Sequence, residues 1–244
     1  MKYMGSKNRI AKHILPIILK DRKPNQFYIE PFAGGMNMID KVDGNRIAND
    51  LNKYLIAMWK GLVDDLERPY TISKELYSRA RNEYNNKTNI EFSDFLIGWI
   101  GWMGSYNGRF FDGGYSGHSV GKTKRNYISE QIRNTEKQIN KLKGVEFFSM
   151  DYSKLIIPKN SIIYCDIPYQ NTKQYSTSKN FNYYKFWNWV RFMSIHGHSV
   201  YVSEYNAPDD FIIVWEMPVT NSMNQTKTYK PVEKLFTYNL QQKI

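Results

Sequence analysis

Cysteine is nearly absent from this sequence: Cys165 is the one cysteine in 244 residues. A single cysteine excludes an internal disulfide framework and a zinc site made of several cysteines, and it suits a reducing compartment. A long hydrophobic run is also lacking, because no stretch approaches the ~18–20 apolar residues that span a bilayer. The first residues are not a signal peptide, since their apolar stretch is short and is broken by Pro16 and charges. These absences predict a soluble, cytoplasmic protein.

Several ligand-binding motifs are missing as well. There is no G-x-x-x-x-G-K-[ST] segment, so a P-loop nucleotide hydrolase is unsupported. The glycine-containing loop around Gly34 is not a G-x-G-x-x-G loop. No H-E-x-x-H segment or Cys/His cluster accompanies the 4 histidines, so we expect no bound metal.

Positive charge and aromatic side chains are abundant. There are 34 Lys+Arg against 23 Asp+Glu, which gives a formal net charge of +11. This balance favours a polyanionic partner, usually nucleic acid, although a merely soluble basic protein has the same composition. With 41% hydrophobic residues, 6 Trp, 19 Tyr and 13 Phe, the chain is expected to fold around one sizeable core.

Short apolar segments alternate with helical patterns along most of the chain. The strand-like segments are QFYIE, the segment that ends at Asp50, VEFFSM, SIIYC, HSVYVSE, FIIVWE and VEKLFTY. This alternation predicts an α/β fold with a mostly parallel sheet. The last two segments are separated only by a polar loop, so they are expected to pair as an antiparallel hairpin.

The middle of the chain has a different composition. Residues 68–143 begin with polar helical segments and continue into a glycine- and aromatic-rich stretch, GWIGWMGSYNGRFFDGGYSG. We therefore predict two domains. Residues 1–67 and 144–244 form the main domain, and residues 68–143 form an inserted module with another task.

A glycine loop follows the first predicted strand. Ligands of open α/β sheets bind beyond the carboxyl ends of the strands, and the loop IEPFAGGMN lies at such an end. Gly34 and Gly35 allow the backbone to turn tightly and to approach a ligand. Asp50 ends the next strand, where an acid can accept hydrogen bonds from both hydroxyls of a ribose. A plain turn also uses paired glycines, but the acid-terminated strand favours a nucleoside-containing cofactor.

The segment SIIYCDIPYQN suggests chemistry on an amine. Its strand delivers Asp166, Ile167, Pro168 and Tyr169 to a carboxyl end. An adenine amino nitrogen is a poor nucleophile, and a carboxylate with a backbone carbonyl can hold its two N–H bonds and direct its lone pair. Proline stiffens the turn, and the aromatic ring can stack on an extracted base. A strand that ends in a proline turn, with Tyr169 in the core, would show the same four residues.

Together these segments resemble the Dam-type, D12-class DNA adenine methyltransferases of the α-group. YMGSK resembles the W-x-G-G-K opening of that family, and IEPFAGGMN resembles its E-P-F-x-G-x-G loop. IANDLN resembles the ribose-binding acid segment, and YCDIPY resembles Y-C-D-P-P-Y. SYNG resembles a Y-N-G element of the recognition region, and VEKLFTY resembles the final strand. The matches follow the family order and cover nearly the whole chain.

The resemblance implies a Rossmann-like methyltransferase sheet with an inserted, mainly helical target-recognition domain. It implies S-adenosylmethionine as the methyl donor, and transfer to N6 of a flipped-out adenine in duplex DNA. The implied catalytic residues are Asp166, Ile167, Pro168 and Tyr169. The implied cofactor-binding residues are Tyr3, Lys7, Pro31, Phe32, Gly34, Asp50, Asp151 and Asp166.

The resemblance also places the DNA contacts in the insertion, where cations can neutralise phosphates and polar side chains can read bases. The expected DNA-binding residues are Tyr106, Asn107, Arg109, Lys122, Lys124 and Arg125. Tyr106 or Phe110 is a candidate to fill the space left by a flipped base. A solvated basic face with a flexible glycine loop would have the same composition.

Three positions depart from the family pattern. Ile167 replaces the first proline of D-P-P-Y, Gly35-Met36 replaces the usual small residue and glycine, and Tyr3 replaces a tryptophan. None of them removes a charged group that the chemistry needs, so we expect an active enzyme. A catalytically weak DNA-binding protein, or methylation of RNA or of a protein amide, stays open. The recognition sequence is also open, and GATC is the first sequence to test. The sequence does not decide whether the protein works with a restriction partner. The resemblance suggests a monomer, but the oligomeric state is open too.

Overall fold

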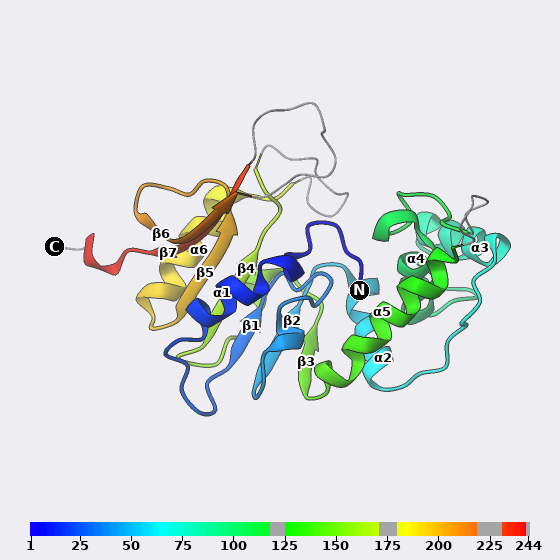
Figure 1. Ribbon diagram of the computed structural model, residues 1–244, viewed down its shortest axis with the longest axis horizontal. Helices are drawn as coiled ribbons and strands as arrows, with labels where there is room; N and C mark the ends of the chain where they lie inside the picture. Colours follow the sequence, from blue (N-terminus) through cyan, green and yellow to red (C-terminus); the bar gives the residue numbers. More distant parts are fainter. Residues whose placement is uncertain (118–124, 171–179, 219–230, 243–244) are drawn as a thin grey trace.

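The computed structural model describes residues 1–117, 125–170, 180–218 and 231–242 (Figure 1). Within them lies a seven-stranded sheet in the order β3-β2-β1-β4-β5-β7-β6. The strands are β1 (Tyr28–Glu30), β2 (Arg46–Asn49), β3 (Val145–Phe148), β4 (Ile162–Asp166), β5 (Ser199–Glu204), β6 (Phe211–Pro218) and β7 (Val232–Tyr238). Strands β1 to β5 pair in parallel, whereas β7 is antiparallel to both β5 and β6. The predicted fold class, a mostly parallel sheet with an antiparallel strand near the carboxyl end, is confirmed.

Polar side chains start most of the helices. The helices are α1 (Ala11–Ile18), α2 (Lys53–Val63), α3 (Lys74–Asn86), α4 (Asp94–Gly104), α5 (Tyr127–Leu142) and α6 (Tyr183–Ile195). From α2 onward, each begins after an Asn or Ser whose side chain accepts a backbone N–H of the first turn. In the described part of the chain, no helix combines the length and the apolar character needed to cross a bilayer.

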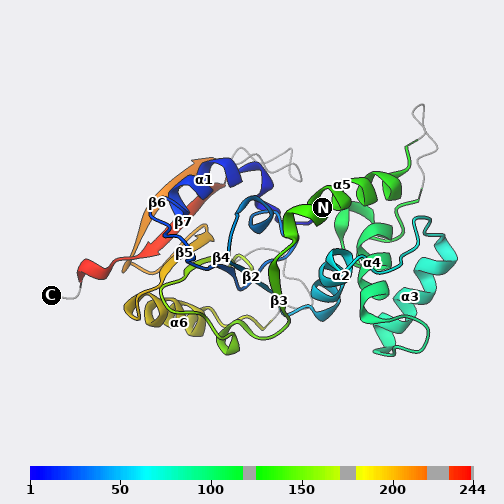
Figure 2. The same ribbon diagram turned by 90° about the horizontal axis from the view of Figure 1, so that it is seen from below.

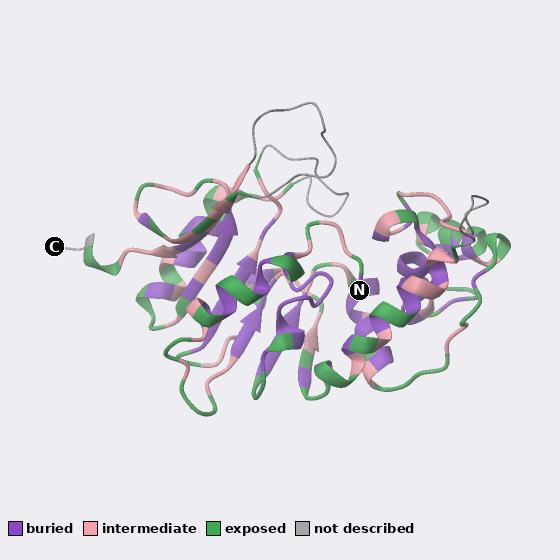
Figure 3. Cartoon of the chain, in the orientation of Figure 1, coloured by how far each residue is buried: buried purple, intermediate pink, exposed green. Residues whose placement is uncertain are grey.

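The central strand β4 is buried on both faces of the sheet, and its successive side chains point to opposite sides. In β4, Ile162 and Tyr164 belong to the larger hydrophobic cluster, which includes Ile14 of α1. Ile163 and Cys165 belong to a second cluster, on the α6 side. Figure 2 shows α1 and α6 on opposite sides of the sheet, and Figure 3 shows the buried strands between them. Cys165 is fully buried and packs as a small hydrophobe, and this burial raises the pKa of its thiol well above the usual value.

The region predicted as an insertion is mainly helical and stands to one side of the sheet (Figure 1). It contains α3, α4 and α5, and it packs on α2 of the sheet portion. A Cβ atom on Gly98 of α4 would lie 2.2 Å from the carbonyl oxygen of Tyr54 in α2, so these two helices meet at close range. The larger hydrophobic cluster continues from the sheet through α2 into α4 and α5. The domain boundaries at residues 68 and 143 therefore stay a prediction.

Helix α5 carries a buried polar stripe that reaches the loop after β1. Gln131, Thr135 and Gln138 lie on its buried face. The Nε2 atom of Gln131 donates to the carbonyl of Lys2 at 3.0 Å. The Nε2 atom of Gln138 lies 3.3 Å from the carbonyl oxygen of Gly35 and 3.3 Å from that of Met36. Buried polar groups are nearly always paired, so the two glutamines tie the insertion to the amino-terminal segment and to the glycine loop.

We predict that Gln138→Met destabilises the fold by about 1–3 kcal/mol, because the glycine-loop carbonyls lose their donor inside the core. The free energy of unfolding in urea measures this change. Thr135→Val is the matched control on the same buried face, because the Thr135 hydroxyl bonds the carbonyl of Gln131 in its own helix. If the two variants were equally stable, the tie between α5 and the loop would contribute nothing.

Candidate active site

The segments that follow β1, β2, β3 and β4 meet at one edge of the sheet. Asn49, fully buried at the end of β2, holds two of them together. Its Nδ2 atom donates to the carbonyls of Pro31 at 2.9 Å and of Met150 at 3.0 Å, and its Oδ1 atom accepts the Met150 N–H at 3.1 Å. This brings the predicted site residues Pro31, Asp50 and Asp151 to the same edge as Asp166, the last residue of β4.

Tyr3, Gly34 and Asp50 come together in the glycine loop. The N–H of Gly34 donates to Oδ2 of Asp50 at 3.1 Å, and the N–H of Asn52 donates to Oδ1 at 2.9 Å. Gly34 has a φ of +48°, and a Cβ atom there would lie 2.9 Å from Cε1 of Tyr3. Burial raises the pKa of Asp50 although the two N–H groups oppose this. The glycines thus let Tyr3 lie against the loop backbone, while Asp50 fixes the loop to the end of β2.

Met36 occupies the position where the resembled pattern has its last glycine. Its φ is +56°, in the left-handed region, and its side chain is fully buried in the larger hydrophobic cluster. A left-handed conformation costs a residue with a Cβ atom on the order of 1 kcal/mol, and burying a methionine side chain offsets such a cost. The substitution therefore keeps the left-handed turn at this position and anchors the loop in the core.

Phe32 and Asp151 lie on the α6 side of this edge. The ring of Phe32 is 5.2 Å from that of Tyr152 and 5.8 Å from that of Phe186 in α6. Asp151 caps the 3-10 turn η4 (Tyr152–Lys154), because its Oδ1 atom accepts the N–H of Ser153 at 2.9 Å. Burial by itself would raise the pKa of Asp151. The hydrogen bonds from Ser153 and the positive charges of Lys185 and Lys154 outweigh this effect, so the pKa lies below its usual value. Asp151 is therefore an ionised carboxylate at neutral pH.

Lys7 forms ion pairs with two acids of the site. It begins the 3-10 turn η1 (Lys7–Arg9), and its side chain is 9% exposed. Its Nζ atom lies 2.7 Å from Oδ1 of Asp166 and 3.6 Å from Oε1 of Glu233 in β7. Burial alone would lower the pKa of Lys7, but these two carboxylates outweigh it and raise the pKa. Lys7 therefore stays charged, and it joins the amino-terminal segment to β4 and β7.

Asp166 is an acid poised near neutral pH. Burial raises the pKa of its carboxyl group to about 6, although Lys7 lowers it. The negative charges of Glu233 and Glu204 add to the upward shift. Above this pH Asp166 is mostly a carboxylate that accepts hydrogen bonds, and the carboxylate becomes the minor form as the pH falls through about 6.

The three residues after Asp166 are firmly held. The side chain of Ile167 is 3% exposed and packs in the α6-side cluster. The carbonyl of Pro168 accepts the hydroxyl of Tyr183 at 2.9 Å. The ring of Tyr169 has the Lys7 ammonium 4.5 Å from its centroid, and its hydroxyl donates to Glu233. The turn that the sequence assigned to proline rigidity is thus fixed by packing and by hydrogen bonds as well.

Glu233 and Glu204 are two buried acids that the sequence analysis missed. Glu204 ends β5, and its Oε1 atom accepts the N–H of Gln170 at 2.5 Å. Glu233 lies near the start of β7, and an antiparallel strand brings its amino end to the edge where parallel strands bring their carboxyl ends. A signal was present: Glu233 shares the strand face of the buried Leu235, where a charge is unusual.

The candidate DNA-contact loop of the insertion packs on the amino-terminal segment. It contains the 3-10 turn η3 (Tyr106–Gly108) and is closed by a bridge between Ser105 and Tyr115. Tyr106 is 56% exposed. A Cβ atom on Gly108 would lie 2.3 Å from the carbonyl oxygen of Lys2, so this loop directly contacts the segment that carries Tyr3.

The other candidates of the insertion lie in different settings. Phe110 stacks on Trp102 with a centroid distance of 4.0 Å, so of the two aromatic candidates Tyr106 is the exposed one. Arg109 is half-buried, and Asn107 has a left-handed φ of +59°. Arg125 forms two hydrogen bonds of 2.7 Å with the carboxylate of Glu130. Lys122 and Lys124 lie outside the described residues.

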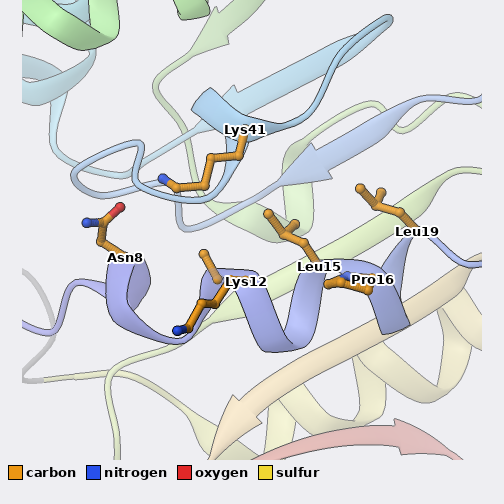
Figure 4. A pocket seen from close by; sticks show the side chains of 7 residues that line it. Asn8, Lys12, Leu15, Pro16, Leu19 and Lys41 are labelled. Carbon is orange, nitrogen blue, oxygen red and sulfur yellow. The ribbon is translucent and has the colours of Figure 1, made fainter.

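A pocket of about 490 Å³ lies away from these residues, along α1 (Figure 4). Its walls include the apolar side chains of Leu15, Pro16 and Leu19 and the ammonium-bearing Lys12 and Lys41. None of the carboxylates described above lines it, so it is not the candidate active site. In the described ranges, no three His, Cys, Asp or Glu side chains come together in a way that could hold a metal ion.

Two comparisons with known proteins bear on this site. The family model of the D12 class N6 adenine-specific DNA methyltransferases matches residues 3–234. A solved structure of SMU.472, described as a methyltransferase complexed with SAH, is similar at 12% identity with a TM-score of 0.40. That match covers 95% of this chain and 52% of the other, so the chain spans about half the length of that protein. A likeness this remote supports no conclusion about substrate or cofactor.

We predict that Lys7→Met moves the pKa of Asp166 above about 6, because the variant keeps the burial of the carboxyl group and removes the adjacent positive charge. Carbon-13 NMR titration of the aspartate carboxyl groups measures the shift. Lys12→Met, which removes an exposed lysine on α1, should leave this titration unchanged. An Asp166 pKa at or below the original value in Lys7→Met would refute the assignment of Lys7 as its counter-ion.

Proposed function

Because the chain belongs to the D12 class N6 adenine-specific DNA methyltransferase family, we propose that it transfers a methyl group from S-adenosylmethionine to N6 of an adenine flipped out of duplex DNA. Membership of this family supports adenine-specific methyl transfer as the activity. The observation that carries the proposal is the poised carboxylate of Asp166 at the end of β4, beside the glycine loop and Lys7.

The glycine loop fits a nucleoside-containing cofactor. The side chains that would hold it are Tyr3, Phe32 and Asp50, with the backbone of Gly34 between them. Each oxygen of Asp50 receives one backbone N–H, and a carboxylate oxygen has a second acceptor site, so the residue can still accept the hydroxyls of a ribose. Leu51, next in the chain, is 58% exposed and offers an apolar surface beside that acid. When bound, S-adenosylmethionine supplies the methyl group.

Asp166 and Ile167 are proposed to hold the adenine amino group. The Asp166 carboxylate accepts one N–H of that group and the backbone carbonyl of Ile167 accepts the other, so the nitrogen lone pair points away from both acceptors. Tyr169 is proposed to stack on the base, and Lys7 to keep Asp166 ionised. The carbonyl of Ile167 is present whatever its side chain, and that side chain serves packing, which supports an active enzyme despite the missing proline.

The insertion is proposed to bind the duplex. The exposed Tyr106 is proposed to contact DNA bases, and Asn107 and Arg109 lie beside it in the same loop. Arg125, Lys122 and Lys124 are proposed to neutralise phosphates, for which Arg125 must exchange its carboxylate partner Glu130 for a phosphate. Direct contact of this loop with the amino-terminal segment supports a shared boundary between the DNA and cofactor sites.

We expect the purified protein to transfer label from S-adenosylmethionine to unmethylated mixed-sequence duplex DNA as N6-methyladenine. Asp166→Ala should lower the rate by about 100-fold or more, because one of the two acceptors is lost. Glu233 remains beside Lys7 in this variant, so the fold should be retained. Mapping the methylated adenines gives the recognition sequence, with GATC as the first test.

Binding of S-adenosylhomocysteine, measured by calorimetry, is the control for Asp166→Ala and should change no more than a few-fold. Measurable binding of cofactor and DNA with no transfer by the unmodified protein would favour a non-catalytic DNA-binding protein instead. Transfer to RNA or to a protein amide in preference to duplex DNA would reject the proposed substrate.

We also predict that Tyr106→Ala weakens duplex binding by about tenfold or more, because stacking of an aromatic ring on a base is lost. Fluorescence anisotropy with a labelled duplex measures the affinity. Tyr184→Ala removes a tyrosine that is 79% exposed on α6, and it should bind DNA as the original protein does. Equal losses in both variants would place the DNA contact elsewhere.

A further inference from the structure

Glu233 is a buried acid to which the proposed reaction assigns no role. It is 6% exposed, and its side chain reaches the sheet edge from β7, on the far side of β5 from Asp166. A lone buried carboxylate is costly, and a protein retains one where it is paired and hydrogen-bonded. Both partners of Glu233 belong to the candidate site: the Tyr169 hydroxyl donates to it, and Nζ of Lys7 lies 3.6 Å from Oε1.

These two contacts hold two groups of the candidate site in place, the Tyr169 side chain and the Lys7 ammonium. Tyr169 is held through its backbone by the turn after Asp166 and through its hydroxyl by Glu233, so the direction of its side chain from Cβ to the hydroxyl is fixed. The edge of the Tyr205 ring adds a further contact, with centroids 4.8 Å apart. Lys7 is held between Asp166 and Glu233, with its ammonium 4.5 Å from the centre of the Tyr169 ring.

We propose that Glu233 is a positioning residue for methyl transfer, which orients the Tyr169 ring for stacking on the target adenine and holds Lys7 against Asp166. This inference rests on the proposed function and adds a residue of β7 to it. The first role depends on the ability of Glu233 to accept a hydrogen bond. The second role depends on its negative charge, so the two are separable by substitution.

Glu233→Gln keeps an acceptor for the Tyr169 hydroxyl and removes one negative charge. Among the described residues, the charged and acidic groups that interact with Asp166 are then Lys7, Glu204 and Glu30, with the phenols of Tyr164 and Tyr169 nearby. Because the charge of Glu233 raises the pKa of Asp166, its removal should lower that pKa. The acid limb of the rate profile should then move to lower pH, with little change in rate at neutral pH.

Glu233→Met removes both the charge and the acceptor. We expect kcat/KM for duplex DNA to fall by about tenfold, with the affinity for S-adenosylhomocysteine changed less than threefold, because the loss concerns the base and not the glycine loop. Tyr169→Phe removes the same hydrogen bond from the other side. If Glu233 acts through Tyr169, the double variant should be no worse than the poorer single variant by more than about twofold.

The matched control is Glu216→Gln, which removes the same charge from an exposed position on the neighbouring strand β6. It should leave the pH profile and the rate unchanged. The inference is overturned if Glu233→Gln does not move the acid limb and if the losses in Glu233→Met and Tyr169→Phe simply multiply. Should Glu233→Met fail to fold, Tyr169→Phe and Glu233→Gln decide together: an unchanged kcat/KM for duplex DNA in Tyr169→Phe and an unmoved acid limb in Glu233→Gln overturn the inference.

The same experiments separate this inference from the proposed function. No methyl transfer by the unmodified protein would reject the proposed function before any variant is compared. Transfer by the unmodified protein, together with Glu233 variants that match the Glu216→Gln control, would reject only the role of Glu233.

Discussion

Among the residues that the structure describes, the ammonium group of Lys7 is the one that forms ion pairs with the acids at this sheet edge. Asp166 and Glu233 approach it from β4 and β7, and Glu204 adds a third acid nearby. Buried charges are tolerated only where they are paired, so these strands can bring their acids together only if the amino-terminal segment lies across them. The site is therefore assembled from the first residues of the chain and from strands that lie more than 150 residues further on.

The amino-terminal segment is itself held by the insertion. Gln131 of α5 binds the carbonyl of Lys2, and Gly108 of the candidate DNA-contact loop lies against the same carbonyl. On its other side, Tyr3 lies on Gly34 and Gly35. The glycine loop proposed to hold the cofactor and the loop proposed to contact DNA thus both pack against the same short backbone segment, Lys2 and Tyr3. A small movement of that stretch would reach both sites, because close-packed groups transmit displacement.

The two unusual residues of the motifs have a common physical explanation. Met36 adopts a left-handed conformation where the resembled pattern has glycine, and Ile167 follows Asp166 where that pattern has proline. Both side chains are buried in hydrophobic clusters, one on each face of the sheet. In each case the packing of the buried side chain restrains the backbone at that position. This restraint stands in for the conformational freedom of glycine or the rigidity of proline, so the departure from the motif is compatible with a well-defined loop.

The sequence by itself determined the periodic and local features. The alternation of apolar strands with helices set the α/β class, and the short polar loop between FIIVWE and VEKLFTY set the antiparallel pair. The motifs, through their resemblance to a family pattern, predicted that Tyr3, Gly34, Asp50 and Asp166 belong to one site. These features depend on the pattern of side chains over a few residues, and such a pattern can be recognised directly in the amino-acid sequence.

Only the tertiary structure decided which distant side chains meet. Glu233 is at the site because β7 runs antiparallel, so its amino end reaches the edge that parallel strands reach with their carboxyl ends. The structure also shows that three side chains hydrogen-bond to loops far away in the sequence, namely Asn49, Gln131 and Gln138. The sequence alone does not show which carbonyls are their partners. The elevated pKa of Asp166 likewise arises from burial and from charges on other strands. Such effects depend on distance in space, which residue order does not encode locally.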